Sequence, residues 1–289
     1  MTILFLHVPK TAGSFIDSQI QKSEYKSKHA ISSKPAIEKV IHENLDYICG
    51  HFIYNDIEIY LENQENKLVS LVRNPIDRLF SEANYHIEIL SRGKDFFEKH
   101  GSAAQALIRK TYICIKNERD NSNSAEINHL YSFGLDNYLS KRILPSELQN
   151  QCKNETPHHC AKKIKALLNN YSFIQTVENN GVENLIDYIS KNSGIKFSSS
   201  SKATAFRNKS NNYINPSLHL TTIAEKLRKD CDLSNLLYLI IFGISINFFK
   251  DKTWGYINEY ASAKFISESN YLKITSCDKL PNIDFVALQ

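Results

Sequence analysis

The amino-acid sequence predicts an α/β fold, a single domain built on a central parallel sheet flanked by helices. Three short apolar segments, at residues 3–6, 47–53 and 67–72, have the length and composition of buried strands. The first and the third are followed by segments with helical apolar periodicity, at about 14–24 and 75–91. Strands that alternate with helices are typical of parallel sheets with right-handed crossovers.

The later part of the chain is predicted to be more helical. Residues 93–165 are expected to form a helical insertion over one end of the sheet, and residues 250–289 a C-terminal tail. Asn74 is predicted to cap the helix at 75–91, with Pro75 in its first turn. The other predicted elements are helices at 35–42, 55–63, 102–116, 125–133, 181–192, 215–229 and 233–248, a strand at 171–177, and loops at 26–33 and 197–212.

The composition predicts a globular protein with a mild positive charge. Apolar residues make up 42% and charged residues 23%, which are ordinary values for a globular domain. The formal net charge of +4 suits an anionic ligand but is too small to predict nucleic-acid binding. No apolar run approaches the roughly 18 residues of a membrane span, and the strand at residue 3 leaves no room for an export signal. We therefore predict a cytoplasmic protein whose six cysteines are reduced.

The loop after the first predicted strand carries groups that bind anions. It contains Lys10, Thr11, Gly13 and Ser14, and a helix follows it directly. A strand, a tight loop and a helix together present backbone N–H groups and a helix N-terminus to an anion. Lys10 adds a charge, and Thr11 and Ser14 add hydroxyl donors. Taken alone, the loop fits equally well a simple corner in which Ser14 caps the helix.

Polar residues also follow the other two early strands. Gly50 and His51 come after the second strand, and Arg73 comes after the third. Ser81 lies two turns into the helix that follows Arg73, so its hydroxyl can face the same crevice. Ligands of open parallel sheets bind outside the carboxyl ends of the strands. A nucleotide with phosphates at two separated positions would account for both the first loop and Arg73.

Two motifs resemble the nucleotide-binding motifs of a known enzyme family. Residues 7–14, His-Val-Pro-Lys-Thr-Ala-Gly-Ser, resemble the 5′-phosphosulfate loop of PAPS-dependent sulfotransferases, in the branch with carbohydrate and heparan sulfate 2-O-sulfotransferases. Residues 71–81 are similar to the family's 3′-phosphate motif, and residues 50–52 to the segment that carries the catalytic base. The resemblance covers about the first ninety residues. Phe15 stands where relatives often have a second hydroxyl, and Asn74 replaces a common Asp.

The resemblance implies a P-loop-like sulfotransferase fold and a PAPS-dependent O-sulfotransferase, which releases PAP and needs no metal. Lys10 would act at the leaving phosphate, and His51 would take the acceptor's proton during in-line transfer. The expected acceptor is a glycan, ahead of a peptide tyrosine or a small-molecule alcohol. The PAPS-binding core would span about 1–92 and 170–250. The residues expected to bind PAPS are Lys10, Thr11, Ala12, Gly13, Ser14, Arg73 and Ser81, with Arg207 and Lys209 as weaker candidates.

Other functions stay open at this point. The chain could bind a nucleotide or an anionic glycan without catalysing a reaction. A P-loop-type kinase is disfavoured, because the loop lacks the G-x-x-x-x-G-K-[ST] spacing and no Asp follows a strand to serve Mg²⁺. A zinc site from the two cysteines and two histidines within residues 152–160 is conceivable, but their spacing matches no standard ligand pattern.

Individual residues have alternative roles as well. His51 could be an ordinary core histidine, and Arg73 could simply pair with Asp77. His86 and Glu82 lie near Ser81 on the same helix and are the reserve candidates for the base. The sequence carries no signal for the oligomeric state.

Overall fold

The structure, a computed structural model, describes residues 1–21, 25–117, 132, 136–149, 157–195, 197 and 233–245. Arg207 and Lys209 lie outside the described residues. So do the helix predicted at 215–229, the tail at 250–289 and all but one residue of the helix predicted at 125–133. No helix in the described ranges is both long and apolar enough to cross a membrane.

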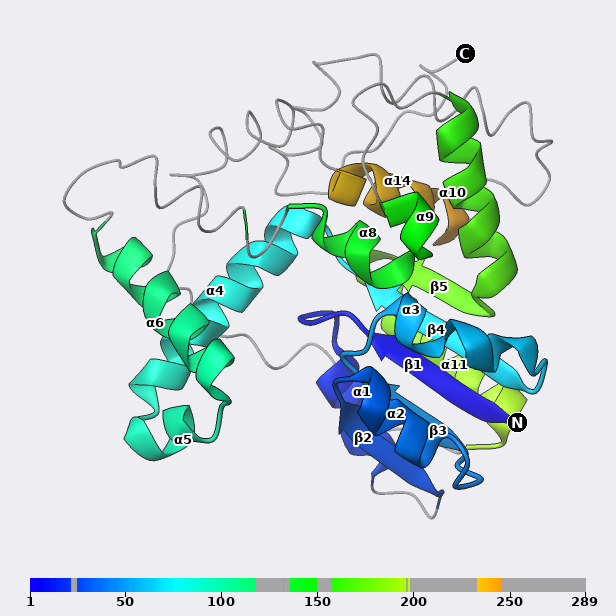
Figure 1. The fold of residues 1–289 in the computed structure, drawn as a ribbon, viewed down its shortest axis with the longest axis horizontal. Coiled ribbons are helices and arrows are strands. Elements are labelled where there is room, and N and C mark those ends of the chain that lie inside the picture. The colour runs from blue at the N-terminus through cyan, green and yellow to red at the C-terminus, as the bar shows by residue number, and fades with distance from the viewer. Residues whose placement is uncertain are drawn as a thin grey trace.

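A five-stranded sheet forms the centre of the described chain (Figure 1). All neighbouring strands run parallel, in the order β2-β3-β1-β4-β5. Helices cover both faces, so the predicted α/β class, with a central parallel sheet flanked by helices, is confirmed. The strands are β1 (Thr2–His7), β2 (Ser27–Ile31), β3 (Tyr47–Gly50), β4 (Asn66–Val72) and β5 (Phe173–Thr176).

The side chains of β1 enter two cores, because successive residues of a strand point to opposite faces of the sheet. Ile3 and Phe5 belong to one core, and Leu4 and Leu6 belong to the other; all four are fully buried. The first core is closed by α1 (Gly13–Ile20) and α11 (Gly181–Ser193), and the second by α2 (Lys34–Val40), α3 (Tyr54–Ile57), α8 (Tyr138–Ile143), α10 (Pro157–Asn170) and α14 (Leu233–Ser245).

The three central strands end side by side. Leu6 of β1 lies opposite Gly50 of β3 and Ser70 of β4, and His7 lies opposite Leu71. The segments that follow β1, β3 and β4 therefore leave the sheet from one edge. This carboxyl edge is where ligands of open parallel sheets bind, and Lys10, His51 and Arg73 all follow strands that end there.

The helix after β4, α4 (Pro75–Ser91), begins and ends where the sequence predicts. The side-chain oxygen of Asn74 accepts hydrogen bonds from the backbone N–H groups of Ile76 (3.0 Å) and Asp77 (3.3 Å). Pro75 stands in the first turn, where its missing N–H has no partner to lose. The predicted cap and the predicted start of this helix are both confirmed.

The described parts of residues 93–165 are largely helical. The far part of α4 packs with the next two helices around Ile89, Phe97 and Ile108, and these three helices lie together on one side of the sheet in Figure 1. The bounds of a single domain and of an insertion stay predictions. The helices of this segment are α5 (Lys94–Glu98), α6 (Ser102–Asn117), α8, α9 (Ser146–Gln149) and α10.

The loop predicted at 26–33 is wrong, because this segment contains β2. Its sequence, Ser-Lys-His-Ala-Ile, lacks the apolar alternation that indicates a strand. Among the described strands β2 lies at the edge of the sheet and pairs with β3 alone, so polar side chains are tolerated on it. Gly50 permits the close pairing, since a Cβ at that position would overlap the backbone of Ile31.

The remaining differences concern short helices and the ends of elements. β3 ends at Gly50, before residue 53, and α1 ends at Ile20, before residue 24. The helix predicted at 55–63 is the short α3 followed by a 3₁₀ turn, η1 (Glu58–Glu62). The helices without a predicted counterpart are α5, α8, α9 and α10.

Candidate functional site

The loop between β1 and α1 has an uncommon backbone. Lys10 (φ 69°) and Ala12 (φ 64°) both adopt the left-handed conformation, although neither is a glycine. Few non-glycine residues adopt it, and those that do gather at ligand sites. The buried hydroxyl of Thr11 donates a 2.6 Å hydrogen bond to the carbonyl oxygen of Val8. The loop conformation is therefore held by the chain's own contacts.

The backbone N–H groups of Lys10 to Ser14 lie in this loop and in the first turn of α1. None of them donates a hydrogen bond to a described residue. N–H groups in such a loop, together with a helix N-terminus, favour an anion. The N-cap of α1 is Ala12, so the alternative in which Ser14 caps the helix is wrong. Ser14 is exposed to solvent at this position.

The side chain of Lys10 extends from the loop toward α4. Its Nζ lies 4.2 Å from the centre of the Tyr85 ring, in a cation–π contact. Burial lowers the pKa of Lys10, Glu82 and Glu88 raise it, and the Arg73 guanidinium lowers it further. These neighbours all belong to α4 or to the turn before it. The loop after β1 and the helix after β4 therefore face each other across the site.

His51 follows β3 and directs its ring toward the end of β1. Its Nδ1 donates a 2.9 Å hydrogen bond to the backbone carbonyl oxygen of His7. A carbonyl oxygen can only accept, so the neutral ring of His51 carries its proton on Nδ1 and has a lone pair on Nε2. The residue is exposed, so the alternative that His51 is a core histidine is wrong. An accessible Nε2 lone pair is what a general base needs.

The surroundings of His51 favour its neutral form. Packing of the ring against protein atoms lowers its pKa below the usual value, and the Arg142 guanidinium lowers it further. The hydrogen bond to His7 and the carboxylates of Glu82 and Asp17 act in the opposite direction. Because the residue as a whole is exposed, solvent screening limits the size of the shift. The ring is therefore mostly neutral at pH 7.

Arg142 connects the helical segment to this site. It lies on α8, and its Nη1 donates a 3.1 Å hydrogen bond to the backbone carbonyl oxygen of His51. Its guanidinium also lies 4.7 Å from the centre of the Tyr138 ring. The sequence analysis missed Arg142, because it is 91 positions from His51 and belongs to no motif.

Arg73 and Ser81 lie on the α4 side of the site. Arg73 is half-buried, and its pairing with Asp77 stays an alternative. Ser81 precedes Tyr85 by four residues, so both lie on one face of α4. Because Tyr85 touches Lys10, this face borders the loop. A phosphate between Arg73 and Ser81 stays a prediction.

The two reserve candidates for the base have other partners. Glu82 forms an ion pair with the Arg78 guanidinium on the same helix. His86 is buried, and its Nδ1 lies 3.1 Å from the hydroxyl oxygen of Thr111 on α6. That hydroxyl donates its own proton to the carbonyl oxygen of Leu107. Both residues therefore stabilise α4 and its packing, which leaves His51 as the better candidate for the base.

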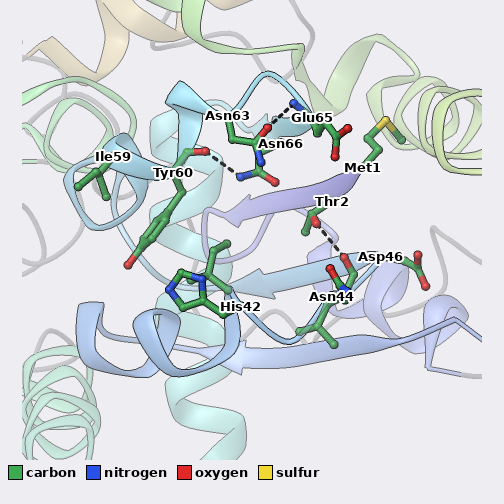
Figure 2. A pocket seen from close by; sticks show the side chains of 12 residues that line it. Met1, Thr2, His42, Asn44, Asp46, Ile59, Tyr60, Asn63, Glu65 and Asn66 are labelled. Carbon is green, nitrogen blue, oxygen red and sulfur yellow. Dashed lines mark hydrogen bonds between the residues drawn. The ribbon is translucent and has the colours of Figure 1, made fainter.

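A pocket of about 470 Å³ lies at the opposite edge of the sheet, where β1 and β4 begin. Figure 2 shows Thr2 and Asn66 at these strand starts, with His42 and Tyr60 nearby. Among the predicted site residues that the structure describes, none lines this pocket. Within the part of the chain that the structure describes, no group of three His, Cys, Asp or Glu side chains could hold a metal ion.

Comparison with known proteins gives a weak structural likeness. No family model matches the sequence, and no curated protein matches it. Among solved structures, the mouse sulfotransferase SULT7A1 complexed with PAP is similar, with 14% sequence identity and a TM-score of 0.40. The match covers 95% of this chain and 86% of the mouse chain. A likeness of this strength does not assign the present chain to a family.

Proposed function

We propose that the protein is a PAPS-dependent O-sulfotransferase. The observation that carries the proposal is the position of Lys10 and His51 at the same edge of the sheet. Lys10 lies in a loop suited to an anion, and His51 has a lone pair on Nε2. Lys10 supplies positive charge where a leaving phosphate becomes more negative, and His51 accepts a proton from a hydroxyl. The motifs at residues 7–14 and 71–81 support this assignment.

The proposed reaction is an in-line displacement at sulfur. The acceptor's hydroxyl oxygen attacks the sulfur atom of PAPS, while the bond from sulfur to the 5′-phosphate oxygen breaks on the opposite side. Nε2 of His51 takes the hydroxyl proton as the bond between the acceptor oxygen and sulfur forms, which gives the sulfate ester. PAP departs with the added negative charge on its 5′-phosphate, where Lys10 and the loop N–H groups stabilise it.

The nucleotide would bind along the carboxyl edge of the sheet. The backbone N–H groups of residues 10–14 would hold the 5′-phosphosulfate, with the Ser14 hydroxyl as a further donor. Thr11 would contribute through its backbone, because its hydroxyl already bonds Val8. Arg73 would hold the 3′-phosphate by a bidentate contact, together with Ser81. Arg207 and Lys209 are proposed more weakly, for the same phosphate or for the acceptor.

The acceptor is proposed to be a hydroxyl group of a glycan. This part of the proposal rests on the resemblance of residues 50–52 and the neighbouring motifs to carbohydrate sulfotransferases. A cytoplasmic location is proposed from the sequence alone. The competing possibility is a protein of the same fold that binds a nucleotide or an anionic glycan without transferring a group.

Calorimetry with PAP and PAPS tests the nucleotide site. We expect dissociation constants between about 1 μM and 1 mM, the range common for enzyme substrates. If the folded protein bound neither nucleotide at millimolar concentration, the proposal would be wrong. Binding of PAP, without sulfuryl transfer to any member of a panel of glycans, phenols and alcohols, would favour the non-catalytic alternative.

His51→Ala tests the base separately. We expect kcat to fall by about 10²- to 10⁴-fold, as is usual on loss of a general base, while PAP affinity stays unchanged. His42→Ala is the matched control, because His42 lines the pocket at the opposite edge of the sheet. An equal loss of turnover and PAP affinity in His51→Ala would contradict its role as the base.

A further inference from the structure

A column of three rings leads from the core of the sheet to the candidate base. Phe5 and His7 are two positions apart on β1, so their side chains point to the same face, and their ring centres are 5.7 Å apart. The ring centres of His7 and His51 are 4.6 Å apart. We name Phe5, His7 and His51 the ring column. Its inner end is buried, and its outer end is the exposed His51.

His7 is the member of the ring column that contacts both the start of α1 and His51. Its side chain is buried and packs directly on Gly13, where a Cβ would overlap the imidazole. Its backbone carbonyl oxygen accepts the hydrogen bond from Nδ1 of His51. His7 thus contacts the first turn of α1 through its ring. It contacts His51, the candidate base, through both its ring and its carbonyl group.

We propose that His7 is a positioning residue for His51, a role that rests on the proposed function. The backbone carbonyl of His7 selects the tautomer of His51. The buried ring of His7 supports the His51 imidazole and excludes water from that side. Together they hold Nε2 on the side of the ring that is open to an acceptor. Gly13 completes the arrangement, since only glycine leaves room for the His7 ring.

The ring of His7 is neutral where it packs against His51. Burial lowers the pKa of His7 to about 3, and the charges of His51, Arg142 and Lys10 act in the same direction. A neutral ring can pack against His51 before and after His51 takes a proton, whereas a charged ring would repel the protonated form. The titratable and charged groups that face His51 are His7 from β1, Asp17 from α1, Glu82 from α4 and Arg142 from α8.

The test compares His7→Ala with His7→Phe in the folded protein without a ligand. Ala removes the ring and admits water beside His51, so NMR titration of the His51 ring should show its pKa rising toward the usual value of about 6.5. Phe keeps a buried ring, so the pKa of His51 should stay at the wild-type value. An unchanged pKa in His7→Ala, or a raised pKa in His7→Phe, would overturn the proposal.

The pH dependence of kcat gives a second readout. In His7→Ala the acid limb should move to higher pH by the same amount as the His51 pKa, and in His7→Phe it should stay in place. An acid limb of kcat that does not shift together with the His51 pKa would also overturn the proposal. Absence of sulfuryl transfer in the wild type would refute the proposed function, while the NMR comparison would still decide whether His7 supports His51. If His7→Ala does not fold, His7→Phe alone decides through its NMR titration.

Discussion

At the scale of single residues, backbone conformation shapes the loop between β1 and α1, residues 8–12, which we call the anion loop. Lys10 and Ala12 hold left-handed conformations that side chains disfavour, and Gly13 provides space for the ring of His7. Ala12 and Gly13 act through geometry rather than through a functional group, whereas Lys10 also carries its ammonium group. The loop is therefore sensitive to changes that leave its charge and hydroxyl groups intact.

Gly13→Ala should damage the loop without removing any polar group. The added Cβ overlaps the His7 ring, so we expect the free energy of unfolding to fall by about 1–3 kcal/mol, the usual cost of overpacking. PAP binding should weaken as well. Gly101→Ala is the control, because a Cβ at Gly101 meets nothing within 4 Å. Equal results for the two variants in urea unfolding and calorimetry would contradict this account.

His7 should make the protein lose stability in acid. Its pKa is about 3 in the folded protein and about 6.5 in the unfolded chain, so below pH 6.5 the unfolded chain binds a proton that the folded protein refuses. The free energy of unfolding should therefore fall by about 1.4 kcal/mol per pH unit from this group, between pH 6.5 and about 3.

Urea unfolding of the wild type and His7→Phe at several pH values between 7 and 4 measures this contribution. The variant lacks the titrating group, so its stability should fall less steeply as the pH decreases. Parallel curves for the two proteins would show that His7 does not carry the effect.

At the scale of elements, α4 places several groups opposite the anion loop. Its start is set by the Asn74 cap and Pro75, directly after β4 ends at the carboxyl edge of the sheet. Ser81 and Tyr85 then follow on one face, and Tyr85 meets the ammonium group of Lys10. The position of one helix thus links the candidate 3′-phosphate residues to the candidate 5′ loop.

Tyr85→Leu should weaken the connection between α4 and the loop. The cation–π contact with Lys10 is expected to stabilise the fold by about 0.5–1 kcal/mol, and Tyr85→Phe should keep it because the ring face remains. Unfolding free energies of Tyr85→Leu, Lys10→Met and the double variant measure the coupling. Strictly additive losses would show that the contact contributes nothing.

At the scale of the whole molecule, the site combines parts that are far apart in the chain. The loop follows β1, His51 follows β3, and Arg142 comes from α8, much later in the chain. The parallel register brings the strand ends together. Packing of α8 on the core then delivers a positive charge beside the candidate base.

Arg142→Gln should raise the pKa of His51. The guanidinium disfavours a proton on the His51 ring, so its removal should move the pKa of that ring upward in an NMR titration. Lys141→Gln is the matched control, since Lys141 is exposed on the same helix and pairs with Asp136. A similar shift in both variants would point to a general charge effect rather than to the contact of Arg142.

Local patterns predicted those elements whose burial or capping depends on neighbouring residues. β1 and β4 are continuous apolar segments, and Asn74 with Pro75 marks the start of α4. β2 was missed because its sequence is polar and it forms through pairing at the sheet edge. The short helices after α6 were missed for a related reason, since their place depends on packing with distant segments.

The sequence alone determined which chemical groups stand at the strand ends: Lys10 in a short loop, His51 after an apolar segment, and Arg73 before a capped helix. Only the tertiary structure decided how they act. The bond from His51 to His7 joins residues 44 positions apart, and that from Arg142 to His51 joins residues 91 apart. Such contacts depend on strand register and helix packing, which no local pattern encodes, and the bond to His7 is what leaves the lone pair of the neutral His51 ring on Nε2.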